Sequence, residues 1–206
     1  MDCDDDFNMS DRGTESKGND DDLYVPFGTG KAISLEHDDV LSAVLWSSVN
    51  ALLDRESTDR GFFGSIPLSL MRADIDLLFR GDRRYRVMEK THGVHYIMFL
   101  TTVFLEGADT NQPVVAMLNR VGTWVIVQIP AVPSLFQNGT LLDGELVRNY
   151  DDTFSFVVFD VFCVSGKRYI DRSFTARVDV IHSVVAKMKK SHADVLSSSK
   201  MSSSKF

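Results

Sequence analysis

The chain has 206 residues, of which 44% are hydrophobic, and a formal net charge of −7 at pH 7. This length fits one domain with or without tails, and the apolar fraction excludes a chain that is disordered throughout. The two cysteines, Cys3 and Cys163, are too few for a disulfide framework or a cysteine-based zinc site, which indicates a reducing compartment.

The sequence shows no targeting or membrane-spanning signal. The first residues are acidic, where a secretory signal would be basic and then apolar. The longest apolar stretch, 94–105, is interrupted by polar side chains and is too short to cross a bilayer. We therefore expect an intracellular protein, in the nucleus or the cytoplasm, with no membrane partner.

The charge divides the chain into three parts. Residues 1–22 hold nine acidic and two basic side chains, whereas residues 23–206 hold 20 of each. Because a strongly acidic segment with few apolar side chains has no face to bury, residues 1–22 are predicted to be a disordered tail. The Ser- and Lys-rich residues 191–206 are predicted to be a second, flexible tail, and the folded domain is expected over 23–190.

Apolar periodicity predicts the elements of this domain in chain order. A helix is expected over 35–55 with Ser34 as its N-cap, and a shorter one between Ser69 and Gly81. The last element, 173–190, has an amphipathic stripe and is predicted to be a helix. Strands rich in Val, Ile, Phe and Tyr are predicted over 84–90, 94–105, 113–118, 123–130, 141–148 and 154–163. This order predicts an α+β fold, a mainly antiparallel sheet with flanking helices.

Charged residues at the ends of these strands form the candidate site. Lys90 ends the first predicted strand and is followed by a glycine turn; if its stem lies inside the sheet, desolvation favours the neutral amine, which is a nucleophile. Asp143 and Glu145 flank a glycine, and Phe159 lies in a strand of apolar residues. A nucleophilic lysine, carboxylates for a hard divalent ion and an aromatic plane for a base suit nucleotidyl transfer. The alternative interpretation is ordinary charges at strand ends.

Five segments in a fixed order carry a more specific signal. They are 62–69 (F-F-G-S-I-P-L-S), 90–96 (K-T-H-G-V-H-Y), 118–120 (L-N-R), 139–147 (G-T-L-L-D-G-E-L-V) and 156–160 (F-V-V-F-D) followed by Ser165-Gly166. In this order they resemble the mRNA capping guanylyltransferases, a family of covalent nucleotidyltransferases, and especially those of large DNA viruses. The resemblance implies a nucleotidyltransferase core.

The resemblance also implies a reaction and its residues. Lys90 would attack the α-phosphorus of GTP, expel pyrophosphate and form lysyl-GMP, and the GMP would pass to the 5′-diphosphate end of nascent RNA. Phe159 would stack on the guanine, and Arg120 would contact the ribose or phosphate. Mg²⁺ or Mn²⁺ would neutralise the triphosphate. The implied nucleotide-binding positions are Thr91, Gly93, Arg120, Glu145 and Phe159, of which Glu145 would also bind the metal.

The chain departs from the family pattern at four positions. His92 and Asn119 stand where the family has Asp, His95 where it has Arg, and Phe63 where it has Pro. An imidazole replaces a guanidinium only partly, because it lacks the fixed charge and the fork of donors. The two histidines have no third ligand nearby in the sequence, so they do not predict a metal site.

The family's later motifs, E-G and K-x-K on strands, and its OB domain have no match in this sequence. We therefore expect a truncated enzyme, or one completed by another polypeptide, and slow transfer by the chain alone because such transfer depends on positioning and charge neutralisation. A viral enzyme would act at the site of viral transcription. Two alternatives stay open: a non-catalytic protein that binds GTP or an RNA 5′ end, and a relative of the polynucleotide ligases.

Overall fold

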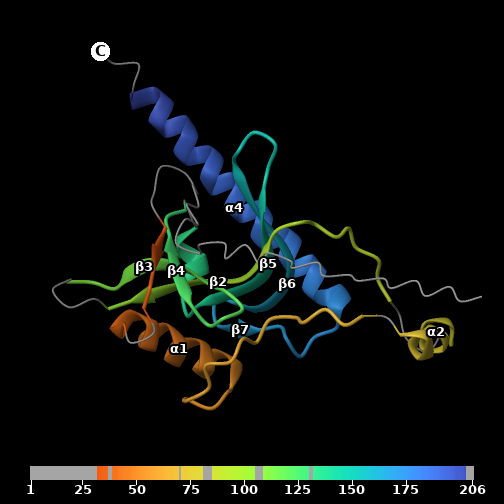
Figure 1. Ribbon diagram of the computed structural model, residues 1–206. Coiled ribbons are helices and arrows are strands. Elements are labelled where there is room, and N and C mark those ends of the chain that lie inside the picture. The colour runs from red at the N-terminus through yellow and green to blue at the C-terminus, as the bar shows by residue number, and fades with distance from the viewer. Residues whose placement is uncertain are drawn as a thin grey trace, which may run out of the picture.

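A single antiparallel sheet of seven strands organises the molecule, in the order β1-β4-β3-β2-β5-β6-β7 (Figure 1). The computed structural model describes residues 32–36, 39–69, 71–80, 85–104, 109–129 and 132–202. The strands are β1 Ile33–Ser34, β2 Val94–Val103, β3 Gln112–Leu118, β4 Trp124–Val127, β5 Thr140–Arg148, β6 Phe154–Val164 and β7 Lys167–Arg168, and the helices are α1 Val40–Leu53, α2 Arg72–Phe79, α3 Pro133–Phe136 and α4 Phe174–Ser202. The predicted α+β class is confirmed.

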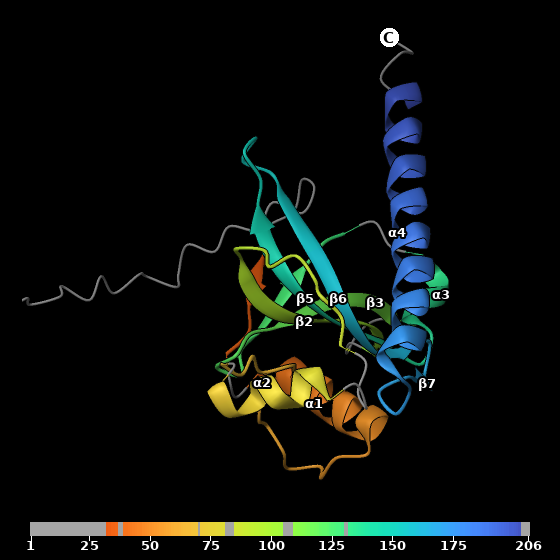
Figure 2. The ribbon, with the colours of Figure 1, turned by 90° about the vertical axis from the view of Figure 1, so that its right-hand side faces the viewer.

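Both faces of the sheet carry a hydrophobic core. Ile97 and Phe99 of β2 pack in one cluster with Trp46 of α1, whereas Met98 packs in a second cluster with Ile181 of α4. This alternation follows from the two-residue period of a strand. Figures 1 and 2 show α1 and α4 on opposite sides of the sheet. Because both faces are covered, β2 is a continuous apolar run.

One predicted strand is wrong. Residues 85–92, which overlap the predicted strand 84–90, have no regular secondary structure. The apolar–polar alternation of this segment stops at Met88, and Val87 is 101% exposed, so the segment offers no face that the sheet could bury. It instead runs into the start of β2 as a connecting segment.

The first helix begins later than predicted. Ser34 is not its N-cap, because this residue pairs with Val125 in the sheet. Asp39 caps α1 instead, and its carboxylate accepts a hydrogen bond of 2.7 Å from the Leu41 N–H. The predicted tail 1–22 and the predicted stop at Gly81 lie outside the described residues.

The helices α2 and α4 also differ from expectation. The apolar face predicted for α2 does not join the core, since Ile75 is 40% and Phe79 84% exposed. The last helix, α4, continues to Ser202, past the expected end at Lys190 and into the segment that was predicted to be a tail. Figure 2 shows its last turns projecting beyond the sheet. None of the described helices combines the length and apolar character that a membrane crossing needs.

A largely buried ion pair ties α4 to β6. Arg177 Nε lies 2.6 Å from Asp160 Oδ1, and Arg177 Nη2 donates to Asp160 Oδ2 at 2.9 Å. The two side chains are only 17% and 12% exposed, and Arg177 Nη1 also donates to the Arg172 carbonyl at 2.6 Å. This two-pronged geometry fixes the start of α4 beside Phe159.

We predict that Asp160→Asn lowers the free energy of unfolding by about 3 kcal/mol, because it leaves a buried guanidinium without its anionic partner. Urea denaturation measures this change. The matched control is Asp152→Asn, which breaks the Arg148 pair whose side chains are 68% and 77% exposed, and it should change stability little. Equal, small effects of both variants would contradict the anchoring role.

Candidate functional site

A pocket of about 440 Å³ opens where β2 begins. It is lined by Ser65, Ile66, Pro67, Met88, Glu89, Lys90, Thr91, His95, Arg120, Glu145 and Phe159. The fold thus gathers five of the six predicted site residues, which come from separate segments of the chain. Gly93 is the predicted residue that does not line it.

Gly93 instead allows two strands to approach closely. A Cβ at this position would lie 2.3 Å from the Leu146 carbonyl oxygen, so any larger residue would push the start of β2 away from β5. Gly144 has a similar constraint, because a Cβ there would lie 2.5 Å from the Phe156 ring, next to a register shift between β5 and β6 at which Phe159 of β6 is the extra residue. Both glycines shape the backbone around the pocket.

Lys90 lies on the pocket wall with its side chain exposed. The expectation that its stem lies inside the sheet is wrong, because the segment that carries it is not a strand. Its Nζ donates a hydrogen bond of 3.2 Å to the Thr91 carbonyl oxygen. Among the described residues, no ion pair joins Lys90 to a carboxylate.

Glu145 lines the same pocket and is held by Thr91, the residue that follows Lys90. The Thr91 hydroxyl donates a hydrogen bond to Glu145 Oε2. In the sheet, Glu145 of β5 is the direct partner of His95 of β2. The carboxylate is therefore oriented from two sides, by the strand register and by the hydroxyl.

Beneath the pocket lies the buried carboxylate of Asp143, which the sequence indicated, together with Glu145, only as a carboxylate for a divalent ion. Asp143 is 0% exposed. Its Oδ1 lies 2.5 Å from His95 Nε2, and its Oδ2 accepts a hydrogen bond of 2.9 Å from the Ser65 N–H. Asp143 and Glu145 project from the same face of β5, because side chains two apart share a face. Both contacts satisfy a charge that would otherwise be costly to bury.

The other nitrogen of His95 holds Arg120. The Nε and Nη2 atoms of Arg120 lie 3.3 and 3.1 Å from His95 Nδ1. The imidazole also contacts two aromatic rings, with centroid distances of 5.0 Å to Phe62 and 5.4 Å to Phe159. His95 therefore links the carboxylate beneath the pocket to Arg120, a role that the sequence did not predict.

Arg120 is presented by the tight turn between β3 and β4. Asn119 Oδ1 accepts hydrogen bonds from the N–H groups of Val121, at 3.1 Å, and Thr123, at 2.9 Å. Such side-chain bonds to the backbone define a local turn. Asn119, in place of the family's Asp, therefore still supplies the oxygen that shapes this turn.

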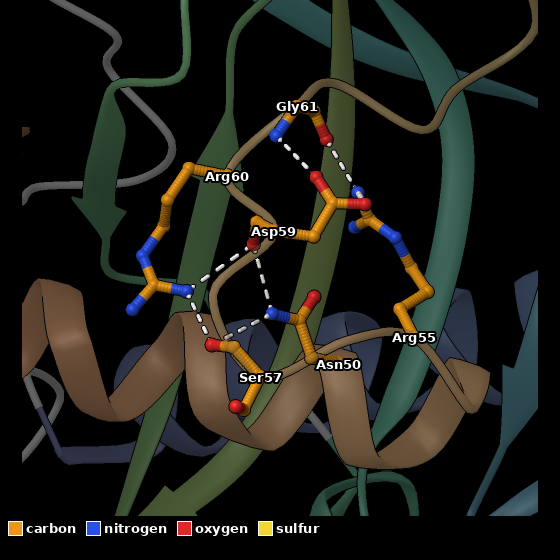
Figure 3. A network of polar contacts seen from close by, with 6 residues as sticks. All are labelled: Asn50, Arg55, Ser57, Asp59, Arg60 and Gly61. Atoms are coloured by element: carbon orange, nitrogen blue, oxygen red, sulfur yellow. Dashed lines mark hydrogen bonds and ion pairs between the residues drawn. The ribbon is translucent and has the colours of Figure 1, made fainter.

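A second polar network fixes the loop that delivers Ser65 (Figure 3). Asn50 Nδ2 donates to the Asp59 carbonyl at 2.8 Å and to the Ser57 carbonyl at 3.4 Å. The Asp59 carboxylate accepts from the Gly61 N–H at 2.8 Å and pairs with Arg55 at 2.6 Å. The Gly61 bond, and then the Arg55 contact, lower the pKa of Asp59. The loop after α1 is therefore held in one conformation by contacts within residues 50–61.

Phe63, where the family has Pro, is part of the same support. The Arg55 guanidinium lies 4.9 Å from the centroid of its ring. The ring also packs 5.8 Å from that of Phe162 in β6. These contacts join the loop to the core below β6.

The two-residue period of β5 is the sequence feature that could have shown Asp143 to be buried. Alternation along 139–147 places Asp143 on the same face as Leu141, which is fully buried. A carboxylate at a core-facing position needs a partner. The strand register, which places His95 opposite Glu145 and within reach of Asp143, is not visible in the sequence, so the partner could not be named.

Metal binding in this pocket would depend on the ligand as well as the protein. Among the described residues there is no group of three or more His, Cys, Asp or Glu that could hold a metal ion. Glu145 and Glu89 nevertheless bring carboxylates to the pocket. One or two carboxylates completed by phosphate and water oxygens is the usual arrangement for Mg²⁺, so these residues fit such an ion.

The antiparallel sheet and this pocket define a nucleotidyltransferase-like core. The model of the family described as mRNA capping enzyme, catalytic domain, matches residues 32–203, so the chain belongs to that family. It is 30% identical over 140 residues to the mRNA-capping enzyme subunit alpha of Neurospora crassa, covering 62% of this chain and 33% of that protein. It is 27% identical over 144 residues to the protein of the same name from Candida glabrata, covering 62% and 31%.

The chain therefore spans about a third of the length of these two relatives. The family resemblance found in the sequence is confirmed. The particular likeness to enzymes of large DNA viruses stays a prediction.

We predict that Asn50→Ala lowers the free energy of unfolding by about 2 kcal/mol. The substitution removes the side-chain amide that donates hydrogen bonds to the Ser57 and Asp59 carbonyls. The loop after α1 should loosen, and the Ser65 amide that binds Asp143 should exchange its hydrogen faster. Hydrogen exchange at Ser65 reads this out directly. The exposed Ser47 of the same helix gives the control variant Ser47→Ala, which should leave Ser65 protection unchanged; unchanged protection in Asn50→Ala would refute the role of the network.

Proposed function

We propose that this chain carries the GTP-binding and lysine-guanylylation site of an mRNA 5′-cap guanylyltransferase. The observation that supports this best is the single pocket that contains Lys90, Thr91, Arg120, Glu145 and Phe159. An exposed amine, an arginine, a carboxylate and an aromatic ring in one cavity suit a nucleoside triphosphate, whose charges and base need those partners.

Lys90 would be the nucleophile. Its Nζ would form a bond to the α-phosphorus of GTP while the bond from that phosphorus to the bridging oxygen breaks, and pyrophosphate would leave with the electron pair. The amine gives up a proton to solvent in this step. In the second step a terminal oxygen of a 5′-diphosphate RNA would attack the same phosphorus and the P–N bond would break, and the nitrogen would take up a proton from solvent and leave as the lysine amine.

The remaining residues would bind and orient the nucleotide. Phe159 would stack on the guanine, and Arg120 would contact the ribose or phosphate. Glu145, oriented by the Thr91 hydroxyl, would serve the ribose and the metal. A bound Mg²⁺ or Mn²⁺ would neutralise charge on the triphosphate. Positioning of this kind supplies most of the catalysis in phosphoryl-type transfer.

The partners of the chain follow from the same proposal. The RNA 5′-diphosphate end would be the acceptor of GMP, and the chain would act where transcripts are made. Because the two relatives are named as alpha subunits, we also propose that another polypeptide contributes to the complete enzyme.

A non-catalytic GTP- or RNA-end-binding protein is the second candidate. The observation that favours it is the side chain at position 95, where an imidazole held by Asp143 replaces the arginine of the family pattern. Such a protein would bind GTP and remain unmodified. A polynucleotide ligase relative would instead be labelled by ATP.

We predict that incubation of the chain with GTP labelled at the α-phosphate, and Mg²⁺, gives an acid-labile protein adduct that ATP does not give. Lys90→Ala should abolish the adduct while the melting temperature stays unchanged, because the side chain is exposed and makes no core contact. Lys187→Ala, which removes an exposed lysine of α4, is the control and should label normally. GTP binding without an adduct would favour the second candidate, and labelling by ATP alone would favour the ligase.

A further inference from the structure

We propose that His95 is a positioning residue that holds Arg120 toward the pocket through a relay of hydrogen bonds, Asp143–His95–Arg120. The inference rests on the proposed function only in taking Arg120 as a nucleotide-binding residue. It assigns a role to a position where this chain departs from its family, and it explains why a buried carboxylate lies beneath the pocket.

The chemistry of the three groups fixes one proton arrangement. A guanidinium has donors and no acceptor, so both Arg120 contacts, at 3.3 and 3.1 Å, require His95 Nδ1 to be an unprotonated acceptor. The proton of the neutral imidazole then lies on Nε2 and is donated to Asp143 Oδ1 at 2.5 Å. A buried carboxylate bonded to a ring N–H is a known way to hold an imidazole in one tautomer and orientation.

The imidazole is also fixed in space. Asp143 is 0% exposed and its second oxygen is bound by the Ser65 N–H, so the carboxylate cannot follow a turning ring. The rings of Phe62 and Phe159 also pack against the imidazole. A rigid acceptor therefore points from the pocket floor toward the turn that carries Arg120.

The relay gives Arg120 two properties that a ligand anion would use. An exposed arginine samples many rotamers, and fixing it beforehand removes that entropic cost from ligand binding. The partner is a neutral nitrogen, so the guanidinium keeps its full positive charge, whereas a carboxylate partner would largely neutralise it. Nη1 is not used by the relay and stays available for a phosphate or hydroxyl oxygen.

The tautomer of His95 tests the relay without any enzymatic readout. Nitrogen-15 NMR of the full 206-residue chain should find the proton of His95 on Nε2. In Asp143→Asn, an amide that keeps the Ser65 bond through its oxygen presents an NH₂ group to Nε2, so the proton should move to Nδ1 and displace Arg120. A wild-type proton on Nδ1, or a tautomer unchanged in folded Asp143→Asn, would overturn the relay.

A double-mutant cycle tests the same claim through GTP affinity and does not depend on Asp143→Asn folding. His95→Ala and Arg120→Ala should each weaken GTP binding about tenfold, the value of one hydrogen bond to a charged group. The double variant should bind no more weakly than Arg120→Ala, because His95 acts through Arg120. Independent effects, about a hundredfold loss in the double variant, would overturn the relay.

Two controls separate this inference from the proposed function. Arg148→Ala removes an exposed arginine that pairs with Asp152 outside the pocket, and it should leave GTP binding unchanged. GTP binding that persists without covalent labelling would count against guanylylation and leave the relay standing. A wild-type His95 protonated on Nδ1 would remove the relay whatever the labelling shows.

Discussion

The candidate site depends on the hydrogen bonds that the buried carboxylate of Asp143 makes with Ser65 and His95. This carboxylate is completely inaccessible to solvent, and a buried charge is tolerated only when hydrogen bonds and partners replace its water. The Ser65 N–H and the His95 ring supply those bonds. One side chain of β5 thereby fixes the loop after α1, the start of β2 and, through the imidazole, the turn that carries Arg120.

The departures from the family pattern are accommodated by this arrangement. His95 stands in the place of an arginine and links Asp143 to Arg120. The family pattern has two arginines at these two positions, whereas this chain keeps one, Arg120, which is held by the imidazole. Asn119 keeps the oxygen that closes the β3–β4 turn, and Phe63 packs against β6 and Arg55. Of these three substitutions, those at positions 95 and 119 change the charge of the side chain relative to the family pattern, and an altered ligand preference or rate would originate there.

The sequence predicted those features that depend on local pattern. Long apolar runs identified the central strands, and ordered motifs identified five of the residues that line the pocket. The prediction failed where a distant part of the chain determines the local structure. Ser34 was predicted to be a helix cap, although it pairs with Val125 in the sheet. Lys90 was predicted to end a strand, although its segment pairs with no strand and is irregular. The role of His95 was missed because it depends on the β2–β5 register, which pairs His95 with Glu145 and lets the ring reach diagonally to Asp143.

The central claim is that one pocket places the Lys90 amine and the Arg120 guanidinium on the same nucleotide. A crystal structure of the chain with GTP tests it most directly. The account predicts the guanine against Phe159 and the triphosphate between Lys90 and Arg120, with the His95 contact to Arg120 intact. GTP bound elsewhere on the molecule, or bound in the pocket with its α-phosphate out of reach of Lys90, would contradict it.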